Sequence, residues 1–411
     1  AMYPDRLNDR GYLGPVMDPN AISEQTLGGQ FWVLDALGEY ADWKGDTRAA
    51  VLAGRLARNL YLPLEDAFAS YPITPVERKS DGSQYGSEVR SVGRWRLSSD
   101  IGCGFGGLDG LTDLYARRPS PEIDALIGRM IARYREEDPA RVQAQMHSTL
   151  TAARSVLRHY ESTGRKDLLR LAAERYDLYR TRAMTDTHEN HNWFGKPWWT
   201  EPCAVIDSFI LAVQLWRFTG EARYLEDAHM AYFNGMAVEQ RANGGFGCNS
   251  CALADTPFVE VRIQEAHWCC TGRGAEGLSR AAQYCFFTDD AGIYVPFYQD
   301  CEAVLRLGSR SMTVRERTKY PWEGAVRLDI LDAGTGIETA IGLFIPSWAE
   351  NPSMKVNGAA AKTVRKAGFI TVTRAWKPGD MVELSFIQRV TARPPVSAAN
   401  GSGYHTFRYG P

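Results

Sequence analysis

The 411-residue sequence lacks several features that would place a protein in a functional class directly. It has no basic run and no interleaving of basic with aromatic residues, and its formal net charge is −2, so we expect no nucleic acid partner. No apolar stretch reaches the roughly 18 residues that a membrane-spanning helix needs, so we expect no membrane partner. Eight cysteines are too few in a chain of this length to form a disulfide scaffold.

The sequence also shows no recognisable signal peptide. Several cysteines occur in patterns typical of metal ligands, and ligand thiols must stay reduced, which favours a cytoplasmic location. A periplasmic or secreted protein remains an alternative if a signal peptide was removed ahead of Ala1. The sequence does not indicate the oligomeric state, for which a dimer is one option.

Two short cysteine segments are the most informative feature that is present. Residues 200–204 read Thr-Glu-Pro-Cys-Ala, and residues 267–271 read His-Trp-Cys-Cys-Thr. Together they offer three thiols and one carboxylate, which is a complete ligand set for a tetrahedral zinc ion. Adjacent cysteines are unusual in a purely structural zinc site, where a CxxC spacing lets the chain curl around the ion. The pair therefore favours a site in which one sulfur takes part in chemistry.

Other interpretations of the cysteines stay open. A free cysteine is most often a small buried apolar residue, and two adjacent cysteines can form a vicinal disulfide. Cys248 and Cys251 form a CxxC pair that could serve zinc or redox chemistry. A four-thiol zinc site would need a second CxxC pair, which the sequence does not contain.

Residues 1–288 carry a weak repeat that predicts helical hairpins. Residues 157–169 and 213–225 each place an aromatic residue four positions before a glycine and a leucine five positions after it. Glycine supplies the left-handed cap that ends a helix, and apolar residues recur at helical spacing on both sides. Such hairpins must stack or close on one another to bury their faces. Long connections at 69–107, 184–200 and 241–275 favour a closed α/α barrel with a functional mouth.

Residues 289–411 switch to strand patterns, from which we predict a β-sandwich domain. Alternating or β-branched runs occupy residues 293–295, 326–330, 340–345, 369–372 and 381–384. Val356-Asn357-Gly358 is a hairpin signal, and Trp-Lys-Pro-Gly-Asp at 376–380 predicts a turn. The sequence ends at Pro411 without an obvious cap, so this domain could be truncated.

Taken together, these segments resemble the glycoside hydrolase family 127 superfamily, a β-L-arabinofuranosidase-like group, over nearly the whole chain. The resemblance rests on Glu201-Pro202-Cys203-Ala204, which matches the family's Glu-x-Cys-Ala, and on the pair Cys269-Cys270. In the sheet region it rests on Tyr-Pro-Trp-Glu-Gly at 320–324, on Ile-Pro-Ser-Trp-Ala at 345–349, and on the hairpin and turn signals given above.

The resemblance implies an (α/α)6 barrel followed by a β-sandwich domain, and a retaining mechanism with a cysteine nucleophile. It also implies a zinc site formed by four residues: Glu201, Cys203, Cys269 and Cys270. Within that site Cys269 would be the nucleophile and Cys270 a permanent ligand. Glu189 would be the general acid/base, with Glu265 as its main rival and Asp186 as a poorer one.

The sequence departs from the family pattern in two places. Thr-Gly-Arg-Gly at 271–274 follows the cysteine pair, where the family has Pro-Pro-Asn. The segment before Glu201 is shorter than in the family and reads His-Glu-Asn-His-Asn-Trp-Phe-Gly at 188–195. The sugar specificity is therefore not carried over.

Histidines and tryptophans in the predicted loops are candidates for substrate contacts. His147 opens a predicted helical repeat where barrel loops begin, and the tryptophans could stack on a sugar ring. The candidates are His147, His191, Trp199, His267 and Trp268. Three other histidines are expected to be surface or packing residues: His159, His229 and His405.

The predicted function is zinc-dependent retaining hydrolysis of an oligosaccharide or glycoside of a plant-type glycan, by a cysteine thiolate. The resemblance implies a β-L-arabinofuranosidase or a hydrolase of a related unusual sugar. Two alternatives stay open. A sugar epimerase or lyase on an α/α barrel would use His, Tyr or Asp and would need no zinc–thiolate cluster. A non-catalytic carbohydrate-binding protein would hold the zinc for structural reasons only.

Overall fold

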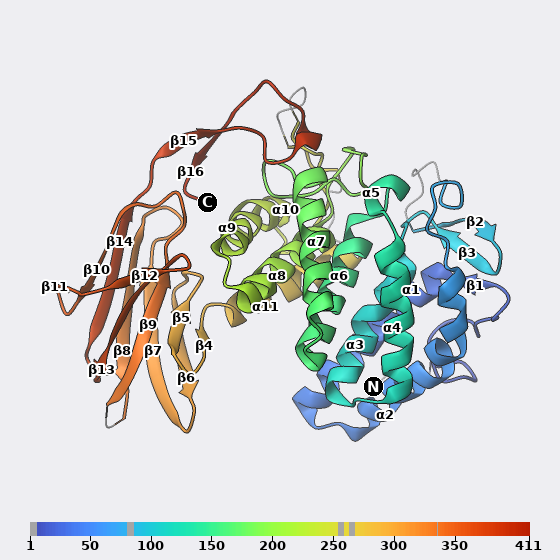
Figure 1. The fold of residues 1–411 in the computed structure, drawn as a ribbon, viewed down its shortest axis with the longest axis horizontal. Helices are drawn as coiled ribbons and strands as arrows, with labels where there is room; N and C mark the ends of the chain where they lie inside the picture. The colour runs from blue at the N-terminus through green and yellow to red at the C-terminus, as the bar shows by residue number, and fades with distance from the viewer. Residues whose placement is uncertain (1–5, 80–85, 254–258, 263–267, 335) are drawn as a thin grey trace.

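The computed structural model describes residues 6–79, 86–253, 259–262, 268–334 and 336–411, and it places a helical region before a sheet domain (Figure 1). This order confirms the coarse prediction of helices followed by strands. Closure of the helices into an (α/α)6 barrel stays a prediction, as does the domain division into 1–288 and 289–411. None of the described helices combines the length and the apolar character that a membrane crossing requires.

The helical region consists mainly of paired α-helices. They are α1 (Glu24–Lys44), α2 (Thr47–Leu56), α3 (Gly107–Arg117), α4 (Pro121–Glu136), α5 (Pro139–Val142), α6 (Met146–Thr163), α7 (Lys166–Arg182), α8 (Pro202–Thr219), α9 (Ala222–Met230), α10 (Ala237–Glu239) and α11 (Trp268–Gln283). Short π or 3-10 segments are η2 (Ala57–Tyr61), η3 (Leu62–Ser70), η4 (Cys103–Gly106) and η5 (Ala231–Met236). A small sheet of β1 (Ile22–Ser23), β2 (Glu88–Val92) and β3 (Trp95–Ser98) lies at its edge.

Glycines close three of the helical hairpins, two of them at the positions that the repeat predicts. Gly45, Gly164 and Gly220 follow α1, α6 and α8 with φ values of 63°, 71° and 73°. In each case the glycine N–H donates to the carbonyl oxygen four residues earlier, which satisfies the end of the helix.

Helix α8 is the most deeply enclosed of the helices. Its sequence is apolar on nearly every face, and residues 202–213 are all buried. A helix that is apolar all round packs inside a domain rather than on its surface. The residues at its N-terminus, Glu201 and Cys203, are therefore held inside the helical region.

The sheet domain contains two facing sheets. Its strands are β4 (Phe287–Thr288), β5 (Gly292–Val295), β6 (Cys301–Leu307), β7 (Arg310–Thr318), β8 (Ala325–Asp332), β9 (Ile337–Phe344), β10 (Glu350–Val356), β11 (Ala359–Ala360), β12 (Val364–Lys366), β13 (Phe369–Trp376) and β14 (Met381–Ile387). One sheet has the order β11-β10-β14-β8-β7-β6 and the other β12-β13-β9-β5-β4. The predicted hairpin is present, because Asn357 and Gly358 take positive φ values of 52° and 80° between β10 and β11.

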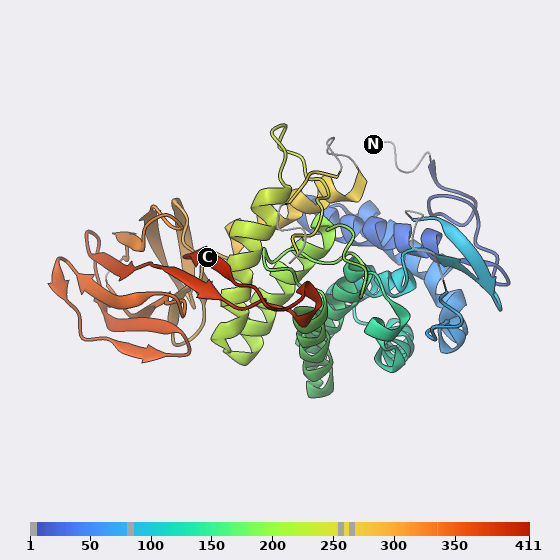
Figure 2. The ribbon, with the colours of Figure 1, turned by 90° about the horizontal axis from the view of Figure 1, so that it is seen from above.

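The last residues of the chain leave the two sheets and return to the helical region (Figure 2). β15 (Val390–Arg393) and β16 (Thr406–Tyr409) pair with each other, with the short η6 segment (Ala398–Asn400) between them. Asn400 Nδ2 donates to the Met184 carbonyl at 3.0 Å. Asp186 accepts from the Val396 N–H and from the Tyr404 hydroxyl, both at 2.6 Å. The C-terminal ribbon thus ties the sheet domain to the loop after α7.

Candidate metal and catalytic site

The N-termini of α8 and α11 meet at the predicted ligand residues. Glu201 is the extended N-cap residue of α8, with φ −138° and ψ 120°, and Pro202 starts the helix. Cys203 lies in the first turn of α8, and Cys269 and Cys270 lie in the first turn of α11. The N-terminus of a helix carries a partial positive charge, which favours carboxylates and thiolates. Two such ends therefore favour a cluster of anionic ligands.

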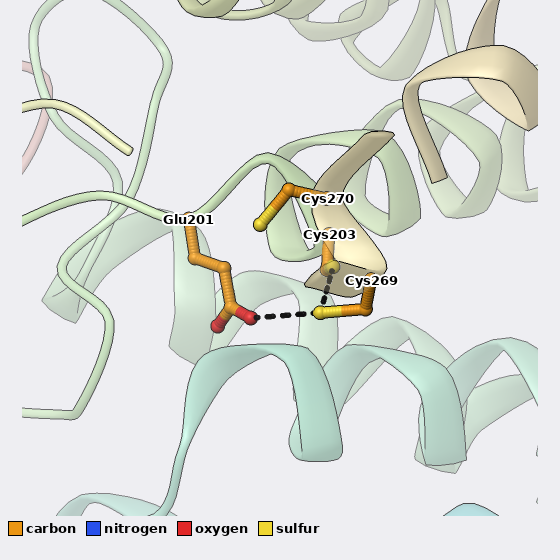
Figure 3. A group of neighbouring side chains, drawn as sticks. All are labelled: Glu201, Cys203, Cys269 and Cys270. Atoms are coloured by element: carbon orange, nitrogen blue, oxygen red, sulfur yellow. Dashed lines mark hydrogen bonds between the residues drawn. The ribbon is translucent and has the colours of Figure 1, made fainter. Parts of the chain in front are cut away.

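The side chains of these residues form one compact cluster (Figure 3). The four ligating atoms of Glu201, Cys203, Cys269 and Cys270 all lie within 4.8 Å of one another. The Sγ atoms of Cys203 and Cys269 are 3.2 Å apart, and the Cys269 Sγ lies 3.8 Å from Glu201 Oε1. Three of the residues are buried and Cys269 is exposed. Cys269 is therefore the sulfur of the cluster that an approaching ligand can reach.

The cluster could hold a metal ion, and its donor set suits zinc. Zinc prefers four ligands drawn from thiolate, imidazole and carboxylate in a tetrahedron. Sulfurs at roughly 2.3 Å from such an ion would lie about 3.8 Å from one another. The spacing of the four donors is of this size, so small movements would complete the tetrahedron.

Burial makes it costly for all four groups to be ionised together. Burial, with the nearby Cys270, raises the pKa of Glu201 well above its ordinary value. Burial and the shared hydrogen bonds with Cys269 and Cys270 likewise raise the pKa of the Cys203 thiol. Hydrogen bonds from Cys203, Cys248 and Cys269 lower the pKa of Cys270. The cluster thus favours one negative charge by itself, and a divalent cation would be needed to hold the others ionised.

A fourth thiol, Cys248, lies close enough to this cluster for Cys248 and Cys270 to shift each other's pKa. It is buried, with 1% of its surface exposed. Cys251, the other member of the CxxC, lies instead against the Asn190 carbonyl at 3.7 Å. The two thiols of the CxxC therefore contact different parts of the structure.

A pocket of 210 Å³ opens over the cluster. Its walls include Cys269 and Glu201 together with His147, Trp32 and Asp100. This volume is below the roughly 300–1,000 Å³ of pockets for drug-sized ligands, and it suits a single sugar ring. Burial raises the pKa of Asp100 to about 6. The pocket thus combines a thiol, carboxyl groups, an imidazole and an aromatic platform.

Two family models of β-L-arabinofuranosidases match the chain. The GH127 catalytic-domain model matches residues 195–283, which contain all four members of the cluster, and the GH127 middle-domain model matches residues 292–387. The chain belongs to glycoside hydrolase family 127. This family 127 chain is therefore a glycoside hydrolase, which implies a glycan substrate.

Solved structures of the family share the fold. A GH127 β-L-arabinofuranosidase from Geobacillus stearothermophilus T6 has a TM-score of 0.72 at 17% identity, over 98% of this chain and 70% of that one. A structure described as a glycoside hydrolase has a TM-score of 0.72 at 17% identity, over 99% and 71% of the two chains. A GH127 β-arabinofuranosidase has a TM-score of 0.68 at 16% identity, over 92% and 63%. Among curated protein sequences, none matches this chain.

Glu189, the predicted acid/base of this family 127 chain, is buried beside the cluster but is not a wall of the pocket. Its carboxylate accepts from Thr187 at 2.7 Å and from Asn249 at 3.2 Å, and the Thr200 hydroxyl lies 3.3 Å away. Burial raises the pKa of Glu189, as a proton donor requires. Thr200 directly precedes the ligand Glu201 and also contacts Glu239, at 3.0 Å.

The other predicted substrate contacts are more dispersed. His147 is a wall of the pocket. His191 is buried away from the pocket walls, and burial lowers its pKa to about 4. Trp199 packs edge-on against Trp193, with ring centroids 5.4 Å apart. Three predicted groups fall outside the described residues: His267, Glu265 and the side chain of Trp268. Asp186, the poorer rival for the acid/base, holds the C-terminal ribbon.

The sequence reasoning missed several residues at or next to the site, among them Trp32, Asp100, Asp207 and Arg273. Asp207 follows Cys203 by four residues and Arg273 follows Cys269 by four, so both lie on the same helix faces as the ligands. That spacing is the one signal that could have identified them. Trp32 and Asp100 carry no such local signal, since they enter the pocket from α1 and from the loop after β3.

Proposed function

We propose that this family 127 chain is a retaining glycoside hydrolase with Cys269 as its nucleophile, in a zinc centre that also uses Glu201, Cys203 and Cys270. One observation supports the proposal most strongly. Cys269 belongs both to the four-residue cluster and to the wall of the pocket, and it is the exposed member of the cluster. A nucleophile must be reachable by substrate, whereas a permanent ligand need not be. The buried Cys270 suits the second role.

Different residues of the chain act as nucleophile and as general acid/base in a double displacement. A zinc ion bound by this donor set would supply the positive charge that keeps the thiols ionised at neutral pH. The Cys269 sulfur forms a bond to the anomeric carbon, while the bond from that carbon to the leaving oxygen breaks and a general acid gives that oxygen a proton. Water then replaces the sulfur, and the same group accepts a proton from the water. Two inversions give net retention.

We propose Glu189 as this general acid/base. Burial raises its pKa, which favours the protonated form that a proton donor needs, and its carboxyl group contacts Thr200, the residue before Glu201. Substrate binding would have to bring the leaving oxygen within hydrogen-bond reach of Glu189.

We place the substrate among the β-L-arabinofuranosides of plant-type glycans, or a closely related sugar. The matching family models and the structure from Geobacillus stearothermophilus T6 carry this activity in their descriptions. Five residues are proposed as substrate contacts: His147, His191, Trp199, His267 and Trp268. We further propose that residues 1–288 form the (α/α)6 barrel that carries this site and that residues 289–411 form a sheet-rich second domain.

A panel of aryl glycosides tests the proposal. The zinc-loaded protein, assayed with reductant, should cleave the β-L-arabinofuranoside or a close stereochemical relative, and should release the sugar first in its original anomeric configuration. The α-anomers serve as matched controls and should be cleaved far more slowly. Inversion of configuration, or no cleavage of any glycoside by the loaded protein, would refute the proposal.

A further inference from the structure

Helices α8 and α11 contact each other through two pairs of side chains: the cysteines, and an aspartate and an arginine one helical turn further along. Cys203 and Asp207 are four residues apart on α8, and Cys269 and Arg273 are four apart on α11, so each pair shares a helix face. The first turn brings the two sulfurs to 3.2 Å. The next turn brings the Arg273 guanidinium onto the Asp207 carboxylate, where both side chains are buried. The helix packing that brings the four candidate ligands together therefore also fixes the position of Asp207.

Arg273 contacts Oδ1 of Asp207, and the other carboxylate oxygen, Oδ2, faces His147 on α6. The Nδ1 atom of His147 lies 2.8 Å from Asp207 Oδ2. The Thr151 hydroxyl oxygen lies 2.6 Å from the same carboxylate oxygen and 3.1 Å from Nδ1. Trp32 stacks on the imidazole, with ring centroids 5.7 Å apart and an interplanar angle of 27°. Contacts at its edge and on its face thus hold the ring.

The protons in this group can be assigned from the donors and acceptors. Burial acts to raise the pKa of Asp207, but Arg273 and Arg154 outweigh it and hold that pKa below the ordinary value. The carboxylate therefore only accepts hydrogen bonds. At 2.6 Å the one Thr151 hydroxyl proton goes to the carboxylate, so the Thr151 oxygen is an acceptor toward the ring. Both neighbours of Nδ1 accept, and Nδ1 must carry the proton.

We propose that Asp207 is a positioning residue that locks His147 as the Nδ1–H tautomer and so presents an unprotonated Nε2 to the pocket over Cys269. A neutral imidazole in this tautomer offers a hydrogen-bond acceptor at Nε2. It therefore selects a ligand that presents a hydroxyl donor there, such as a sugar hydroxyl next to the reacting carbon. The catalytic consequence depends on the proposed function, whereas the tautomer does not.

The tautomer is measured directly by long-range nitrogen–proton correlation NMR on protein labelled with 15N-histidine. The spectrum is recorded at about pH 8.5, roughly two units above the ordinary histidine pKa. The signal of His147 is assigned by its loss in His147→Gln. The expected pattern is a protonated Nδ1 and an unprotonated Nε2. A protonated Nε2, alone or together with a protonated Nδ1, would overturn the proposal.

Two variants separate Asp207 from its neighbours. In Asp207→Asn the amide can donate to Nδ1, so the His147 signal should shift toward the opposite tautomer. Glu276→Gln is the matched control, because Glu276 accepts from the same Arg154 and Arg273 and its loss removes one carboxylate from the same network. It should leave the tautomer unchanged. An equal shift in both variants would overturn the role of Asp207.

Thr151→Val covers the case in which Asp207→Asn fails to fold. It removes the hydroxyl and keeps the carboxylate, so the Nδ1–H tautomer of His147 should persist. Loss of that tautomer in Thr151→Val would show that Thr151, and not Asp207, fixes it. On an accepted glycoside, Asp207→Asn should lower kcat/KM by about 10- to 100-fold, as expected for the loss of a hydrogen bond to a charged group. If the wild-type protein cleaves no glycoside, the proposed function fails, while the NMR result still decides the tautomer.

Discussion

Cys203 and Cys269 are 66 residues apart in the chain, and their Sγ atoms lie 3.2 Å apart at the joined N-termini of two helices. Their contact means that ligand geometry depends on how α8 packs against α11. A metal ion bound between them would in turn hold the two helices together. Binding to the cluster and stability of the helical region should therefore change together.

The first prediction concerns metal content. Protein purified under reducing conditions without chelator should contain one zinc per chain. X-ray absorption should show three sulfurs at roughly 2.3 Å and one oxygen at roughly 2.0–2.2 Å. Cys203→Ser should lose zinc and lower the thermal midpoint. Cys301→Ser, which alters a half-buried thiol outside the cluster, should do neither. Zinc-free wild-type protein from such a preparation would refute the ligand assignment.

The second prediction concerns the nucleophile. Cys269→Ala should lower kcat by at least about 10³-fold, since the nucleophile is removed, and should lower the thermal midpoint less than Cys203→Ser does, because Cys269 is exposed and Cys203 is buried. Cys285→Ala is the control, since that buried thiol lies near the other end of α11 and should leave turnover intact. Mass spectrometry after reaction with a trapping inhibitor should place the sugar adduct on Cys269. An adduct on Cys270 or on a carboxylate would contradict the assignment.

Local patterns predicted much of the fold because they depend on neighbouring residues. Gly164 and Gly220 end their helices in the left-handed conformation that the repeat requires, and the Asn357-Gly358 turn forms where its dihedral preferences demand. Residues 388–411 show the limit of such patterns. The sequence patterns predicted no strand at 390–393 or 406–409. In the structure these two segments pair with each other, and the chain between them contacts Asp186.

The same distinction between local patterns and long-range contacts applies to the site. Glu201, Cys203, Cys269 and Cys270 could be identified because their residue types form a ligand set, and the structure brings all four together. Most of the remaining pocket lining could not be identified, since Trp32, for example, enters from a helix more than 150 residues away. Such a contact depends on the packing of helices that no local spacing specifies.

The third prediction concerns the acid/base. Glu189→Ala should lower the rate on a substrate with a poor leaving group by about 10²–10⁴-fold, because that oxygen needs a proton. An activated aryl glycoside should be affected much less, and added azide should restore turnover. Glu239→Gln is the matched control, since Glu239 is equally buried and contacts the same Thr200. Equal losses on both substrates in Glu189→Ala would remove Glu189 from the role. The selective pattern in a Glu265→Ala or Glu239→Gln protein would transfer it.

The fourth prediction concerns acid stability at the contact between the two parts of the chain. His229 on α9 is fully buried, and its Nε2 donates to the Pro296 carbonyl at 2.7 Å. The Tyr320 hydroxyl, 2.8 Å from Nδ1, is left to donate to the ring. The neutral ring is thus satisfied on both sides, and protonation of Nδ1 would break the bond to Tyr320. Burial accordingly lowers the pKa of His229 to about 4.

The sign of the pH dependence follows from that shift. An unfolded histidine titrates near roughly pH 6.5, so the unfolded chain takes up the proton first as the pH falls. The contribution of His229 is therefore complete above pH ~6.5, and about 3 kcal/mol is lost by pH ~4. His229→Gln should lower the thermal midpoint at pH ~8 and should make its fall between pH ~6.5 and ~4.5 shallower.

The buried His188 and His191, whose pKa values burial also lowers, would keep part of the slope. His405→Gln, a change at an exposed position, should retain the full wild-type slope. Thermal unfolding across this range decides the matter, because parallel curves for His229→Gln and the wild type would show that His229 does not carry the effect.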